Sequence, residues 1–218
     1  MTALGLLAAA TLFAFRDGVP AMAWLGAATA ASLVGAVSWT FEPAPLGRTL
    51  IVACTACCTV SLFWLEPPRG EFATNYELPD WGWVLVGVSS AALLGTTLTA
   101  MLVGHSYLIA PGLSLRPLML SLGASATALA VRVAVVAGGL TCWTADSGAY
   151  TLNDVGLWLP VRWLVGFAAP LGFVWMAYSA AKIRSTQSAT GILYVAVVCI
   201  FLGELMSLLL TRQTGLPL

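Results

Sequence analysis

The feature that most constrains the fold of this chain is a series of long apolar runs separated by short polar breaks. Seven runs approach the roughly 20 residues that a helix needs to cross a hydrocarbon core about 30 Å thick. They cover residues 2–15, 20–41, 49–65, 82–103, 117–140, 157–181 and 188–210. Only 8% of the residues are charged, against about 25% in soluble domains. The sequence therefore predicts an all-α, polytopic integral membrane bundle of about seven transmembrane helices, or six if the short first run does not span.

The connections between these runs are short and contain residues that stop helices. Glu42-Pro43, Pro67-Pro68 and Pro111-Gly112 all fall between runs, and proline removes a backbone donor while glycine favours turns. The two longest connections, residues 66–81 and 141–156, are too small to fold on their own. We expect one transmembrane domain over residues 1–218 and no soluble domain.

The charges of the chain balance, with nine Lys plus Arg and nine Asp plus Glu. Nucleic-acid binding is set aside because there is no basic excess to neutralise phosphates. The expected partners are the lipid bilayer and other membrane subunits, and the expected location is the bacterial inner (cytoplasmic) membrane.

Orientation follows the basic residues of short loops, which favour the cytoplasm. One face would carry Arg48, Arg116, Lys182 and Arg184, and the other Arg16, Arg69 and Arg212. This margin of four to three predicts a cytoplasmic N-terminus. Six tryptophans flank the two longer connections: Trp64, Trp81, Trp83, Trp143, Trp158 and Trp163. They predict an aromatic belt, with both connections on one side of the membrane.

Three charged residues fall within the apolar runs, where a charge at a helix centre costs roughly 2.5–3.5 kcal/mol on insertion scales. Arg132, Arg162 and Glu204 are all expected in the outer half of the membrane. Tyr194 shares a stripe of three- and four-residue spacing with Glu204, so we expect it in the same buried polar cluster. Two interpretations stay open: a buried pair of Arg132 and Glu204 that fixes helix order, or a site for a proton, an ion or an anionic headgroup.

A second candidate site surrounds His105, the single histidine, near the cytoplasmic end of its run. Tyr107 and Arg116 are close to it in sequence, and together they suit a quinone carbonyl or a lipid headgroup. The simpler interpretation is an interfacial histidine bonded to a loop carbonyl. One histidine cannot supply both axial ligands of a bis-histidine haem.

No cofactor or metal is encoded by a motif. Cys54, Cys57 and Cys58 have a CxxC spacing inside an apolar run, which fits close helix packing better than thiol exchange. Phosphate-binding glycine loops and hydrolase motifs are missing from the sequence. Quinone, lipid or pigment remain open as bound cofactors.

These features favour an accessory or structural membrane subunit, without catalytic activity of its own, in a larger complex. An electron-transport assembly, respiratory or photosynthetic, with quinone or lipid contacts is the expected setting. A small transporter for a proton-coupled or anionic solute is the first alternative, and a lipid-modifying membrane enzyme is the second.

Overall fold

The computed structural model describes residues 80–109, 114–146 and 158–214. This part is all-helical, and it contains four helices that are long and apolar enough to cross a membrane. An integral membrane helical protein is thus confirmed. The predicted runs 2–15, 20–41 and 49–65 lie outside the described residues, so the predicted total of about seven spans stays a prediction.

Three of the four spans are single helices: α4 (Asp80–Ile109), α5 (Arg116–Asp146) and α9 (Thr186–Thr214). The remaining span consists of α7 (Trp158–Trp163), the π-helix η1 (Leu164–Ala168) and α8 (Ala169–Lys182), which follow one another without a break. The predicted start of a connection at residue 141 was wrong, because α5 continues to Asp146. No glycine or proline occurs between residue 141 and Gly148, so nothing in that stretch stops the helix.

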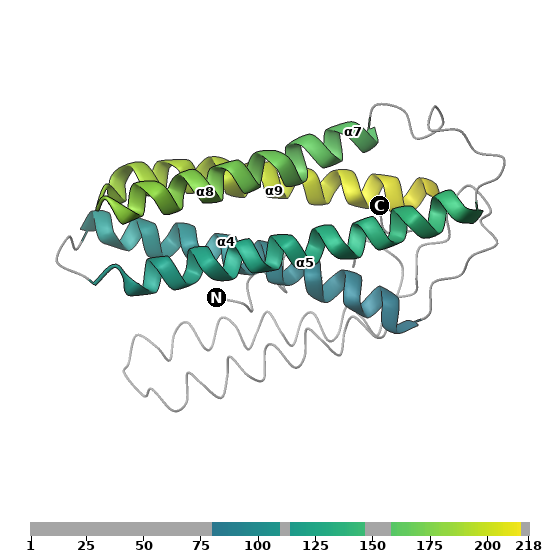
Figure 1. Ribbon diagram of the computed structural model, residues 1–218, viewed down its shortest axis with the longest axis horizontal. Helices are drawn as coiled ribbons and strands as arrows, with labels where there is room; N and C mark the ends of the chain where they lie inside the picture. The colour runs from purple at the N-terminus through teal and green to yellow at the C-terminus, as the bar shows by residue number, and fades with distance from the viewer. Residues whose placement is uncertain (1–79, 110–113, 147–157, 215–218) are drawn as a thin grey trace, which may run out of the picture.

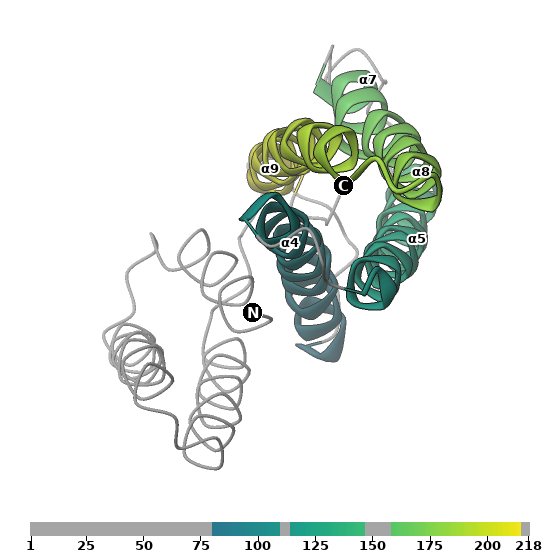
Figure 2. The same cartoon turned by 90° about the vertical axis from the view of Figure 1, so that its left-hand side faces the viewer.

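The four spans form a ring in which each packs against two neighbours. Going around the ring the order is α4, α5, α8 and α9 (Figure 2), with contacts between each consecutive pair and between α9 and α4. The end of α4, the start of α5 and the α8–α9 turn lie at one end of the bundle (Figure 1). We call this the basic end, because the basic residues that flank those connections are Arg116, Lys182 and Arg184.

The opposite end holds the first residues of α4 and α7 and the last residues of α5 and α9 (Figure 1). We call it the tryptophan end. Trp81 at the start of α4 and Trp158 at the start of α7 are both exposed, as residues of an interfacial belt should be. The structure thus places these two predicted belt residues at the same end of the bundle.

The interior between the helices contains two apolar clusters. The cluster nearer the basic end is rich in alanine and leucine and includes Ala100, Leu118, Leu122, Ala177, Ala181, Ala189 and Leu193. The other includes Leu93, Leu129, Val136, Phe167 and Ile200. Small side chains let membrane helices approach closely, which matters because lipid tails are as apolar as the core and leave packing as a main source of stability.

The π-helix η1 has a local cause in Pro170. In a regular α-helix, Pro170 would offer no N–H to the carbonyl of Gly166, and its ring would collide with that carbonyl. The wider turn relieves this conflict, and the N–H of Ala169 donates to the carbonyl of Leu164, five residues back. Such π-turns occur mostly as single interruptions of α-helices, frequently at functional sites. Here η1 follows directly after the turn that carries Arg162.

The α8–α9 turn closes with the pair of hydrogen bonds of a Schellman motif. The N–H of Arg184 donates to the carbonyl of Ala181, and the N–H of Ser185 donates to the carbonyl of Ala180, both at 3.0 Å. Arg184 has a φ of 60°, a left-handed conformation that glycine usually supplies at this position. An arginine here costs about 1–2 kcal/mol of backbone strain.

Candidate functional site

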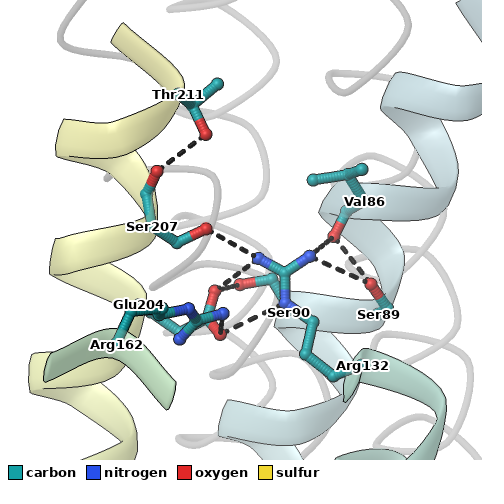
Figure 3. A network of polar contacts seen from close by, with 8 residues as sticks. All are labelled: Val86, Ser89, Ser90, Arg132, Arg162, Glu204, Ser207 and Thr211. Atoms are coloured by element: carbon teal, nitrogen blue, oxygen red, sulfur yellow. Dashed lines mark hydrogen bonds and ion pairs between the residues drawn. The ribbon is translucent and has the colours of Figure 1, made fainter. Parts of the chain in front are cut away.

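The centre of the candidate site is the carboxylate of Glu204 on α9, which is buried among four donors. Its Oε1 accepts from Arg132 Nε at 3.2 Å and from Arg162 Nη2 at 3.1 Å. Its Oε2 accepts from Arg132 Nη2 at 2.8 Å and from Ser90 Oγ at 2.6 Å. A carboxylate has about four lone-pair positions, so this one is saturated (Figure 3).

Arg132 on α5 connects three helices. Its side-on fork of Nε and Nη2 holds both oxygens of Glu204, the bidentate geometry that makes arginine–carboxylate pairs strong. Nη1 reaches α4, where it donates to the carbonyl of Val86 at 3.3 Å and to Ser89 Oγ at 3.4 Å. Nη2 also lies 3.4 Å from Ser207 Oγ on α9. Arg132 is only 1% exposed, so its guanidinium group makes its contacts inside the bundle.

Arg162 on α7 is held differently. It donates one hydrogen bond, from Nη2 to Glu204, and its Cζ lies 4.2 Å from the centre of the Phe167 ring, within cation–π range. Its Nε and Nη1 are buried and have no hydrogen-bond partner among the residues that the structure describes. Arg162 is 0% exposed. The two arginines of the cluster are therefore not equivalent.

Two glycines make room for Arg162. A Cβ on Gly166 of η1 would lie 2.9 Å from the Cα of Gly203 on α9 and 3.0 Å from Arg162 Nη1. A Cβ on Gly203 would lie 2.9 Å from the same Nη1. Since real Cβ contacts are almost never this short, the two backbones touch here only because neither residue has a side chain.

The cluster, defined as Ser90, Arg132, Arg162 and Glu204, joins α4, α5, α7 and α9 through one carboxylate. The structure brings together three of the four residues predicted for it. Tyr194 is not among them: it lies nearer the basic end, 44% exposed. The stripe argument misplaced it because the buried face of α9 passes through Thr190, Leu193 and Ile200 instead.

Tyr194 belongs instead to the surroundings of His105. Its hydroxyl lies 3.3 Å from His105 Nδ1, and the two rings meet edge to face with centroids 6.5 Å apart. Both residues are exposed. The α4–α9 contact beneath them is close, because a Cβ on Gly104 would lie 2.8 Å from Thr190 Oγ1.

The structure does not join His105 to the other two residues predicted beside it. Tyr107 is buried, and its hydroxyl donates to the carbonyl of Ser114, which ties the end of α4 to the α4–α5 connection. Residues two apart on a helix do not face each other. Arg116 is exposed at the start of α5, and no contact in the described part of the chain links it to His105 or Tyr107.

Sequence reasoning missed the three serines that bond to Glu204 or Arg132. Ser90 was not predicted in the cluster, although its hydroxyl donates to Glu204. Ser89 and Ser207 were not singled out, although Ser207 follows Glu204 by three residues and so shares its face. Counting residues from the helix ends would have placed these serines at the same depth as the buried charges.

Within the described ranges, no group of three or more His, Cys, Asp or Glu residues could hold a metal ion. Cys199 on α9 is a free thiol of intermediate burial. The CxxC spacing of Cys54, Cys57 and Cys58 lies outside the described residues. The chemistry available in the cluster is therefore that of two guanidinium groups, one carboxylate and hydroxyls.

Comparison of the chain with protein-family models, with curated proteins and with solved structures finds no match.

Proposed function

We propose that this chain is a structural integral membrane subunit of a larger membrane assembly. The observation that supports this proposal is the saturated carboxylate of Glu204, which receives four hydrogen bonds from three other helical segments. The role that this geometry favours is to fix the order and depth of the helices.

The same observation argues against a proton-exchanging Glu204. A carboxyl group that takes up a proton needs a free lone pair, and its neutral form no longer balances the arginines. At Glu204 both oxygens already accept two donors each. Protonation would leave Arg132 and Arg162 as buried cations without a counter-charge, which is expensive in a membrane. Of the two interpretations of the cluster, the buried structural pair is the one we propose.

The outer surface of the described bundle suits a protein that is surrounded by lipid and other subunits. Large apolar side chains are exposed along the α7–α8 span, among them Leu164, Leu171, Trp175 and Met176. The electron-transport setting and the quinone, lipid or pigment contacts expected from the sequence remain part of the proposal.

Purification from native membranes in a mild detergent tests this function. The co-purifying chains are identified by mass analysis, and an absorption spectrum of the pool detects a pigment, a flavin or haem. We expect stoichiometric membrane subunits to accompany the chain. A chain that runs alone and colourless, and that moves a solute across reconstituted vesicles without other proteins, would refute the proposal and favour the transporter.

The Glu204→Gln variant sharpens this experiment. If the carboxylate is structural, the variant forms a less stable bundle and loses its co-purifying subunits. If the carboxylate exchanges protons, the variant keeps its fold and its partners and loses only activity. Thr97→Val is a matched control, because it removes a buried hydroxyl of α4 that bonds only to its own helix, at the carbonyl of Leu93.

A further inference from the structure

The charges of the buried cluster do not balance. Arg132 and Arg162 bring two positive charges, and Glu204 brings one negative charge. Arginine cannot relieve the excess by losing its proton, because its guanidinium remains charged in proteins. Counted over the residues that the structure describes, a net positive charge thus lies inside the bundle, where such a charge is expensive.

The other acids of the described helices stand at helix ends, far along the axis from the cluster. Asp80 precedes Ser90 by ten residues on α4, about 15 Å at 1.5 Å per residue. Asp146 follows Arg132 by fourteen residues on α5, about 21 Å along the axis. Within the described helices, Glu204 is therefore the one acid at the level of the two arginines.

The cluster with the excess positive charge also contains hydrogen-bond donors without acceptors, and two of them are on Arg162. Arg132 donates to five acceptor positions. Arg162 donates to one, and within the described part of the chain its buried Nε and Nη1 have no partner. Buried polar groups are nearly always hydrogen-bonded. The neighbouring Trp163 also has a buried Nε1 without a partner. All three of these nitrogens are donors, so each requires an acceptor.

We propose that Arg162 binds a small inorganic anion of the chloride class, which completes both the charge and the hydrogen bonding of the cluster. An anion is favoured over water because water would satisfy an N–H but leave the excess charge. A small one is favoured over an organic acid because Arg162 is fully enclosed. The inference stands apart from the proposed function, since an anion of this kind stabilises the bundle whatever the bundle does.

Entry of the anion requires a small displacement of α7 from α9. Arg162 is four residues from the start of α7 at the tryptophan end, about 6 Å along the helix, so the path from that end is short. The π-helix η1 begins two residues after Arg162, and a wide turn of this kind is a natural place for the shift to be absorbed.

The test measures the thermal unfolding midpoint of the full chain in detergent while sodium chloride replaces sodium gluconate at constant ionic strength. We expect a saturable rise of roughly 3 °C or more at ten times the dissociation constant of chloride. The rise should vanish in Arg162→Met. It should persist in Arg116→Met, a matched control that removes an exposed arginine at the basic end.

A second measurement covers the case in which Arg162→Met does not fold. The ³⁵Cl NMR linewidth of chloride, titrated with the wild-type chain, should broaden in a saturable way that bromide competes away. A wild-type chain that shows neither a saturable midpoint shift nor saturable broadening would overturn the proposal. So would an equal chloride response in Arg162→Met and Arg116→Met.

Discussion

At the scale of single residues, the main finding is that two buried arginines around one carboxylate have different roles. Arg132 is bidentate to Glu204 and also reaches Val86 and Ser89 on α4, so its removal leaves acceptors on two helices without donors. Arg162 contributes one hydrogen bond to Glu204, and its Nε and Nη1 have no partner among the described residues. The network is thus built around the Arg132–Glu204 pair.

This asymmetry predicts unequal costs for the same substitution. Arg132→Met should lower the free energy of unfolding by about 3–5 kcal/mol, as expected when one partner of a buried ion pair is removed. Arg162→Met should cost at most about 1 kcal/mol in chloride-free buffer, because it removes one hydrogen bond together with an unbalanced cation. Unfolding in mixed micelles of increasing SDS content measures both. Equal losses for the two variants would contradict the assigned roles.

At the scale of helices, the cluster depends on the close approach of η1 to α9 at Gly166 and Gly203. An alanine at either position would force the helices apart or displace Arg162 Nη1, and overpacking of this kind typically costs about 1–3 kcal/mol.

We predict that Gly166→Ala and Gly203→Ala each lower the free energy of unfolding by about 1–3 kcal/mol. Gly172→Ala on α8 and Gly191→Ala on α9 are matched controls, because nothing lies within 4 Å of a Cβ added at either position. The controls should be neutral or gain up to about 1 kcal/mol from the better helix propensity of alanine. The same SDS titration compares all four variants. If the glycines of the contact respond like the controls, the contact is not as close as described.

The sequence predicted the four described spans because their apolar runs are long and their breaks contain proline, glycine or, at residues 182–187, charged and polar residues. It also predicted that Arg132, Arg162 and Glu204 would lie at a similar depth, since depth follows from counting residues at 1.5 Å each. It did not predict the rotation of α9 about its axis, because nearly every face of that helix is apolar. Tyr194 was misplaced for this reason, and Ser90 was not predicted in the cluster. The π-turn was likewise hidden, since Pro170 alone does not say how a helix will accommodate it.

At the scale of the whole molecule, the described helices form a ring with a basic end and a tryptophan end. Arg116, Lys182 and Arg184 flank the connections at one end, and the first residues of α4 and α7 lie at the other (Figure 1). Basic residues in short loops are retained in the cytoplasm, so we expect the basic end to face it.

Cysteine labelling tests this orientation. In a chain whose native cysteines are replaced by alanine, Ser114→Cys at the basic end and Trp81→Cys at the tryptophan end are both exposed positions. A membrane-impermeant maleimide applied to intact cells should label the second and not the first. Labelling at residue 114 alone would reverse the orientation.

The most direct test of the central claim, that Glu204 holds the helices together, is a double-mutant cycle of Arg132→Met and Glu204→Gln with unfolding free energies measured in mixed micelles. Such a cycle isolates the energy of the pair from the effects of each substitution alone. We predict a coupling of at least about 1.5 kcal/mol, near the top of the range measured for polar contacts between membrane helices. A coupling near zero, with Glu204→Gln as stable as the wild type, would contradict the claim.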